Sequence, residues 1–134
     1  MSNDAPTAWL VIAHGSRAAD LADAHNEVCA ELAEQAPPGV MVRPAYLELT
    51  EPSIPDAVDA AVADSATRVV LLPYFLHIGN HTRRDLPAIL EQAQERHPGV
   101  DLVLAEHLGI DSRLVAILAD RAAAAQARLD HRSP

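Results

Sequence analysis

Short apolar runs alternate with longer segments of helical periodicity along this chain, and no other feature of the sequence restricts its fold as much. The pattern predicts strands at 8–13, 40–47, 68–75 and 100–105, and helices at 20–35, 54–63, 83–97 and from 111 to about 129. Strands that alternate with helices form βαβ units, which require parallel strands. We therefore expect an α/β protein, a three-layer sandwich in which helices flank a four-stranded parallel sheet.

The length of the chain and its turn signals indicate a single domain. A chain of 134 residues has the usual size of one domain with one core, and no linker or low-complexity segment divides it. We assign residues 1–134 to one domain, with a core from about residue 8 to about residue 129. Pro44 lies inside the second predicted strand and cannot donate a ladder hydrogen bond, so we predict an edge position or a bulge there.

Charge and composition exclude several classes of protein. The formal net charge is −9, and the 10 basic residues, all arginines, form no basic run, so binding to nucleic acid is not expected. No apolar run approaches the ~20 residues that span a bilayer. The first residues lack the basic segment of a signal peptide, and the single cysteine, Cys29, cannot form an internal disulfide. We expect a cytoplasmic protein with no membrane contact, in which Cys29 is a small core residue.

Two histidines that follow predicted buried strands are the strongest candidates for chemistry. His14 comes directly after the first strand, and His81 follows the third strand after a polar loop. Ligands of open α/β sheets bind beyond the carboxyl ends of parallel strands. Imidazoles placed at that edge can bind a metal ion or move protons near neutral pH. The alternative for His14 is a histidine that only forms hydrogen bonds within its own loop, whereas we favour a functional role for His81.

Other polar residues reach the same predicted edge of the sheet. Glu48 follows the second strand and can accept protons or complete a metal shell there; the alternative is an exposed loop acid. Ser16 and Arg17 follow His14 at the start of a helix, where free amides favour an anion, and Ser16 is also a possible helix cap. For Asp85, at the start of the next predicted helix, we favour a solvated position.

The remaining histidines carry weaker signals. His77 lies four residues before His81, but Gly79 between them argues against a shared helical face. His107, just past the fourth strand, is a distant candidate. No Cys or His spacing of a closed zinc site occurs, so any metal site is expected to be open, with few protein ligands.

Several segments together resemble one family, the CbiX/SirB class II tetrapyrrole chelatases. The likeness covers residues 8 to about 110, with the motifs in family order. It rests on Leu10–Arg17 with its His-Gly-Ser-Arg, on Tyr46–Ile54, on Pro73–Leu76, on Gly79–His81 and on Asp85–Pro87. His77 departs from the pattern, since an apolar or small residue is expected there. The chain also lacks the histidine-rich stretch that some members carry.

The resemblance implies a fold and an activity. The fold is that of a class II chelatase domain, half of a flavodoxin- or Rossmann-like arrangement. The activity is insertion of Co²⁺, or alternatively Fe²⁺ or Ni²⁺, into sirohydrochlorin in cobalamin or sirohaem biosynthesis. His14 and His81 then correspond to the active-site histidines that bind the metal, and Glu48 to the family glutamate. The divalent ion is a substrate, no organic cofactor is implied, and a single copy of the domain resembles the short form that works as a homodimer.

An acidic protein that binds a polycarboxylate needs local positive charge. Arg17, Arg83 and Arg84 adjoin the two histidines, and Arg43 lies on the second predicted strand. We predict that at least two of these four arginines face the cleft, whereas the alternative for each is solvated surface charge.

Three other functions compete with chelation. A metal or tetrapyrrole carrier would use the same histidines without turnover. A histidine-nucleophile phosphatase resembles this chain only superficially, because Ala13 stands where that class has an arginine before the histidine. A plain partner-binding α/β domain does not account for polar loops that gather at one sheet edge.

Overall fold

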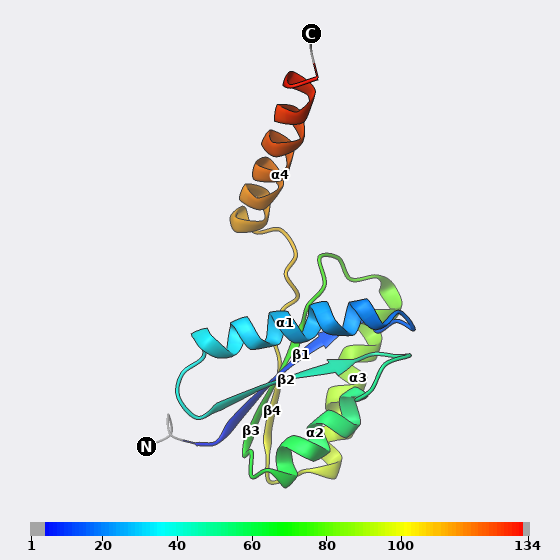
Figure 1. Ribbon diagram of the computed structural model, residues 1–134. Coiled ribbons are helices and arrows are strands. Elements are labelled where there is room, and N and C mark those ends of the chain that lie inside the picture. The colour runs from blue at the N-terminus through cyan, green and yellow to red at the C-terminus, as the bar shows by residue number, and fades with distance from the viewer. Residues whose placement is uncertain (1–4, 133–134) are drawn as a thin grey trace.

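The computed structural model describes residues 5–132 and contains one parallel sheet with four helices (Figure 1). Along the chain the elements are β1 (Thr7–Ala13), α1 (Ala19–Gln35), β2 (Val40–Tyr46), α2 (Ile54–Ala63), β3 (Arg68–Pro73), α3 (Asn80–Arg96), β4 (Asp101–Leu104) and α4 (Ser112–Asp130). The sheet order is β2-β1-β3-β4. The expected α/β fold with a four-stranded parallel sheet is confirmed. The predicted domain of 1–134 includes residues 1–4 and 133–134, which lie outside the described residues.

The strand order explains where the edge residues lie. β1 pairs in parallel with both β2 and β3, and β3 pairs with β4. β2 is therefore an edge strand, and Pro44 sits opposite Val11 on it. A residue without an N–H is tolerated there because one side of an edge strand has no ladder to supply. The edge position predicted for Pro44 is confirmed.

The two faces of the sheet are covered to different extents. One face carries Ala8, Leu10 and Ile12 of β1 with Val69 and Leu71 of β3, and they pack with α2 and α3 in the main hydrophobic cluster. Alternate residues of each strand point to opposite faces. The opposite face, which α1 covers over β1 and β2, is the less buried of the two. Figure 1 shows α1 on one side of the sheet and α2 and α3 on the other.

Helix α4 stands away from the sheet (Figure 1). No residue of this helix is buried, and it forms no extensive packing contact with another described element. The main hydrophobic cluster includes residues up to Leu104, so α4 adds no residue to it, while the domain core of about residues 8–129 stays a prediction. Periodicity shows that a helix has an apolar face but does not show what that face packs against.

Among the described helices, none has the length and apolar content needed to cross a bilayer.

Candidate functional site

The first wall of the site is the loop that follows β1. His14 is exposed, and its ring lies against Phe75 with 5.1 Å between the ring centroids. Gly15 follows with φ of +99°, a conformation that favours glycine. A Cβ on Gly15 would lie 1.7 Å from the carbonyl oxygen of Glu48. Glycine is therefore required for the close approach of the loop after β1 to the loop after β2.

Hydrogen bonds fasten these two loops to each other. The backbone N–H of Leu47 donates to the Ala13 carbonyl and that of Glu48 to the His14 carbonyl, both at 3.0 Å. The Thr50 hydroxyl accepts from the Ser16 N–H at 2.9 Å and donates to the Ser16 carbonyl at 2.8 Å. The β1–β2 pairing thus continues past the strand ends and fixes the backbones of His14 and Glu48 side by side.

The second wall is the start of α3. The helix begins at Asn80 with Gly79 as its N-cap residue, and the Arg83 N–H donates to the Gly79 carbonyl at 3.0 Å. The sequence predicted a loop through residue 82, so the helix starts earlier than expected and includes His81 in its first turn. Asp85 then follows one turn later on the same face, since residues four apart on a helix are neighbours.

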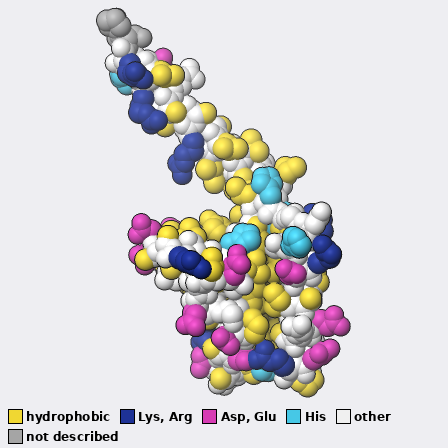
Figure 2. All heavy atoms as spheres, turned by 90° about the vertical axis from the view of Figure 1, so that its right-hand side faces the viewer, with side chains coloured by type: hydrophobic (Ala, Val, Ile, Leu, Met, Phe, Trp, Pro, Cys, Tyr) yellow, Lys and Arg dark blue, Asp and Glu magenta, His cyan; other side chains and the backbone are white. Residues whose placement is uncertain are grey.

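One cavity joins the two walls. Its volume is about 430 Å³, within the range of small-molecule sites. The lining residues are His14, Leu47, Glu48, His81, Thr82, Asp85, Ala88, Ile89 and Gln92. In Figure 2, histidine and acidic side chains stand around a hydrophobic hollow in the body of the molecule. The structure thus brings together His14, Glu48 and His81, although their roles in catalysis stay predictions.

Asp85 is a lining residue that the sequence reasoning missed. We predicted a solvated position for it, and its side chain is exposed, but it also lines the cavity. With the start at Asn80, the i,i+4 spacing between His81 and Asp85 places both on the cavity side. That spacing is the signal that could have found it.

The basic residues predicted at the site do not line this cavity. Arg17 and Arg84 are exposed, and Arg83 lines hollows beside the cavity together with His107. Arg43 pairs with Asp64 at 2.6 Å. None of these four arginines lines the cavity of the single chain, and their role in binding substrate stays a prediction.

Ser16 is not the cap of α1. The N-cap residue is Ala18, whose N–H donates to the Ser16 hydroxyl at 3.0 Å. Ser16 instead fixes the loop after β1 through its backbone, which pairs with Thr50. The chain runs two residues beyond Ser16 before the helix begins, and this distance displaces the side chain from the capping position.

The other histidines take separate places. His77 and His107 line a neighbouring hollow that contains neither His14 nor His81. His25 is buried in α1, and its Nε2 forms a 2.8 Å hydrogen bond with the Val11 carbonyl. His97 ends α3, and its Nε2 lies 2.7 Å from Asp59. His77 does not share a helical face with His81, as Gly79 indicated.

Two buried titratable groups outside the cavity lining have raised pKa values. Burial raises the pKa of the Cys29 thiol. Burial also raises the pKa of the Tyr46 phenol, and the neighbouring Cys29 adds to the effect. Both groups therefore stay neutral at physiological pH, and Cys29 is the small core residue that the sequence predicted.

Within residues 5–132, no three His, Cys, Asp or Glu side chains are close enough together to hold a metal ion by themselves. The cavity can still offer an incoming ion two imidazoles on opposite walls. Imidazole is a ligand of Co²⁺, Ni²⁺ and Fe²⁺, while the carboxylates of Glu48 and Asp85 are proton acceptors. The arrangement suits loose binding and proton transfer more than permanent metal storage.

Comparison with known proteins places the chain in one group. The family model described as CbiX matches residues 8–125. A sirohydrochlorin ferrochelatase of Priestia megaterium is 33% identical over 117 residues, which cover 85% of this chain and 42% of that protein. A sirohydrochlorin cobaltochelatase of Methanococcus aeolicus is 28% identical over 139 residues, which cover 86% of this chain and 96% of that protein. The chain thus spans less than half of the first relative and nearly all of the second.

A solved structure shows the same fold. The crystal structure of a putative cobalamin (vitamin B12) biosynthesis CbiX protein from Marinobacter aquaeolei superimposes with a TM-score of 0.77 and 31% identity. The match covers 92% of this chain and 99% of that one.

Proposed function

This chain belongs to the CbiX family, and on that basis we propose that it is a sirohydrochlorin chelatase, a lyase that inserts a divalent metal ion into the tetrapyrrole. One observation carries the proposal. His14, Glu48 and His81 follow or adjoin the ends of three different strands, match the residues of the family resemblance, and line one cavity. The names of the relatives, a ferrochelatase and a cobaltochelatase, support the same activity.

The reaction exchanges two pyrrole N–H protons for one divalent ion. We assign His14 and His81 to binding the incoming ion, because neutral imidazoles suit Co²⁺, Ni²⁺ and Fe²⁺. As the ion passes to the macrocycle, the released imidazoles are free to accept the protons. Glu48 is a second acceptor, and Asp85, on the wall of His81, is a third. The metal is a substrate and the proposal needs no organic cofactor. Co²⁺ is the first choice, with Fe²⁺ and Ni²⁺ as alternatives.

The charge of the cavity shapes how the substrate binds. Two carboxylates line it, so the acidic groups of a tetrapyrrole are better placed outside it than within. The amino end of α3 contributes partial positive charge at the His81 wall. We assign the binding of the acidic groups on the substrate's rim to Arg17, Arg83, Arg84 and the Ser16 loop. These residues are close to cavity residues in the sequence, but they do not line the cavity.

We propose further that the protein forms a homodimer and that it is cytoplasmic. A macrocycle needs a wide cleft, while one chain offers a cavity at a single sheet edge. Two copies related by a twofold axis enclose more space, and this symmetry is the commonest among oligomers.

An anaerobic optical assay tests the function. Purified protein is mixed with sirohydrochlorin and, in turn, with Co²⁺, Ni²⁺ or Fe²⁺, and the change in the absorption of the macrocycle is compared with the metal-alone rate. We expect acceleration by the protein, and loss of it in His14→Ala and in His81→Ala. The matched control is His131→Ala, because His131 follows α4 and lies outside the cavity lining.

The outcomes separate the competing functions. Stoichiometric metal binding without acceleration favours a carrier. Hydrolysis of a generic phosphate ester that is lost in His14→Ala favours a phosphatase. Activity should also fall at acid pH, because a protonated imidazole ring neither binds metal nor accepts a proton. A rate that stays constant down to pH ~5 contradicts the role given to the histidines.

A further inference from the structure

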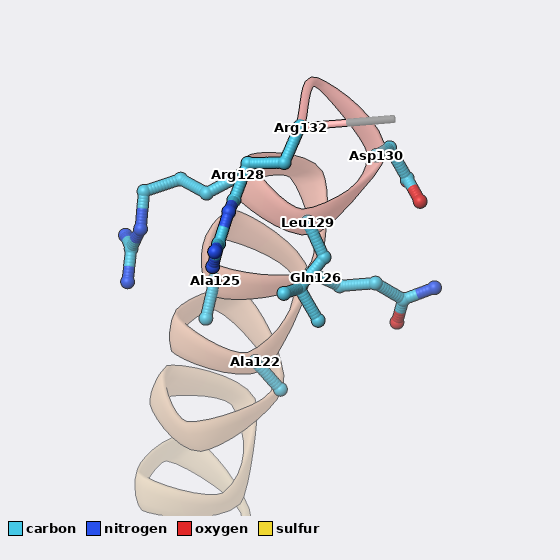
Figure 3. Close-up of a pocket in the computed structure, with 7 residues that line it drawn as sticks. All are labelled: Ala122, Ala125, Gln126, Arg128, Leu129, Asp130 and Arg132. Atoms are coloured by element: carbon cyan, nitrogen blue, oxygen red, sulfur yellow. The ribbon is translucent and has the colours of Figure 1, made fainter. Parts of the chain in front are cut away.

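A second hollow, here called the β4-side hollow, lies between the loops that follow β3 and β4. Its volume is about 630 Å³, within the range of small-molecule sites. The lining residues are Leu76, His77, Ile78, Arg83, Glu106, His107, Leu108, Gly109 and Ile110. The hollow at the end of α4 is of another kind, because its residues all come from one helix and its last turn (Figure 3). The β4-side hollow is instead formed by two loops and by the first turn of α3.

The fold holds the two loops of this hollow together. β3 and β4 are parallel neighbours, so the loops that follow them meet at the same edge of the sheet. The Leu108 N–H donates to the Phe75 carbonyl at 3.0 Å, and this bond brings the backbones of His107 and His77 close to each other. The ring of His107 packs beside Gly109, whose Cβ position lies 3.4 Å from Nε2. The two imidazoles therefore reach the hollow from backbones that are held in place.

The hollow offers hydrogen-bond donors to an anion. Within residues 5–132 the guanidinium of Arg83 forms no ion pair, and a guanidinium binds a carboxylate through two parallel hydrogen bonds. A neutral imidazole still has one N–H donor, so His77 and His107 can contact an anion without being protonated. Glu106 lines the same hollow, and the charge of Arg83 offsets it. A carboxylate is therefore a ligand that suits these side chains.

A metal ion suits the same hollow less well. The positive charge of Arg83 repels a cation. No three His, Cys, Asp or Glu side chains in the described part of the chain are close enough together to hold an ion. His77 and His107 are thus better explained as contacts to an anion.

The β4-side hollow is connected to the cavity of the proposed active site. Thr82 lines that cavity and also a linking hollow of about 230 Å³. Arg83 lines both the linking hollow and the β4-side hollow. Apolar side chains surround the donors, since Leu76 is 53% exposed and Ile110 is completely exposed. A ligand that lies across Thr82 therefore meets the cavity at one end and, at the other, an apolar surface with donors for a carboxylate.

We propose that His77, Arg83 and His107 form a subsite for a carboxylate on the rim of the tetrapyrrole, so that the macrocycle extends from the cavity towards the β4 side of the sheet. The inference rests on the proposed function. It goes beyond that function by giving a role to two histidines that metal insertion does not use, and by selecting one direction for the substrate. These residues then determine the affinity for the macrocycle, while the cavity carries out the exchange of protons for metal.

Titration of the protein with metal-free sirohydrochlorin, followed by the fluorescence of the macrocycle, provides the test. We expect the dissociation constant to rise about fivefold in Arg83→Ala and about tenfold or more in the triple variant His77→Ala/Arg83→Ala/His107→Ala. The affinity of the triple variant should also depend less on salt concentration, because the screened contact of Arg83 is gone. A merely structural disturbance leaves that dependence unchanged. The variant His77→Gln/His107→Gln, which retains N–H donors, should keep most of the affinity.

Arg121→Ala/His131→Ala is the matched control. It removes the same kinds of side chain from α4 and the turn after it, away from the residues that line the β4-side hollow. Its affinity for sirohydrochlorin should equal that of the unaltered chain. In the metal-insertion assay the triple variant should raise KM more than it lowers kcat, since a contact to the rim is made in the ground state as well as in the transition state.

Two results overturn the subsite. One is a triple variant that binds sirohydrochlorin as tightly as the unaltered chain. The other comes from titration with Co²⁺ alone: a Co²⁺ site that is lost in His77→Ala/His107→Ala, with unchanged affinity for sirohydrochlorin, assigns the hollow to a metal ion. The proposed function fails separately, if the unaltered chain binds sirohydrochlorin without accelerating metal insertion, and the variants then still decide on the subsite. An unaltered chain that binds no sirohydrochlorin contradicts both proposals.

Discussion

Gly15→Ala is the substitution that tests most directly how His14 and Glu48 are held together. An alanine Cβ at this position would lie 1.7 Å from the Glu48 carbonyl oxygen, while ordinary contact begins at 3.4 Å. The loops after β1 and β2 must therefore separate by about 1.7 Å, the difference between these two distances. Such a shift stretches the backbone hydrogen bonds from Leu47 to Ala13 and from Glu48 to His14.

The cost follows from two separate terms. A non-glycine residue at a φ of +99° is strained by about 1–3 kcal/mol. Each of the two disturbed hydrogen bonds contributes a net of about 1 kcal/mol. We expect Gly15→Ala to lower the free energy of unfolding by about 3–5 kcal/mol, and to lower the proposed chelatase activity because His14 and Glu48 move apart.

Gly39→Ala is the matched control in urea unfolding followed by circular dichroism. Gly39 has a similar φ of +88°, but no atom lies within 4 Å of its Cβ position. This variant carries only the backbone strain, so its unfolding free energy should exceed that of Gly15→Ala by about 2 kcal/mol. If the two variants are equally stable, the contact with Glu48 does not hold the loops, and the description of this wall of the site is wrong.

Three further predictions concern single groups. Thr50→Val removes both hydrogen bonds to Ser16 and should cost about 2 kcal/mol of unfolding free energy in urea, whereas Thr50→Ser, which keeps the hydroxyl, should cost less. Cys29 should react slowly with Ellman's reagent at pH ~8 until denaturant is added. Because burial raises its folded-state pKa, the unfolded thiol ionises first, so stability should decline as the pH rises above ~8.5; Cys29→Ala should remove that decline. Ser53→Ala deletes the cap that accepts from the Asp56 N–H and should lower the thermal midpoint through a loss of about 1 kcal/mol, which Ser53→Asp should restore.

Much of the fold could be predicted because its signals are local. Helix α2 begins and ends at the predicted residues, since Ser53 and Pro55 mark its start in the sequence. The edge position of β2 followed from one missing N–H, at Pro44. The proximity of His14 and Glu48 could be predicted from the parallel sheet alone, because both residues follow the carboxyl ends of strands. These features depend on turn residues and periodicity, which are determined by residues close together in the sequence.

The parts that sequence reasoning missed depend on distant contacts. The start of α3 lies at Asn80 because Gly79 leads directly into the helix, while the polar segment 76–82 was interpreted as a continuous loop. The exposure of Asp85 was predicted, but its place in the cavity lining was not. The link before α4 is held by hydrogen bonds of Ala105 and Leu108 to residues more than thirty positions earlier in the chain, and no local pattern encodes them.

The two walls of the cavity are held in different ways. Backbone hydrogen bonds and the Thr50 side chain bind His14 and Glu48 to adjacent strands of the sheet. His81 and Asp85 instead lie in the first turns of α3, which follows a loop. The His14 wall is therefore fixed by main-chain hydrogen bonds between strands, whereas the His81 wall is fixed by the packing of buried side chains such as Leu86 of α3. On the proposed function, a substitution in the core under α3 would change the spacing of the two histidines without touching either of them.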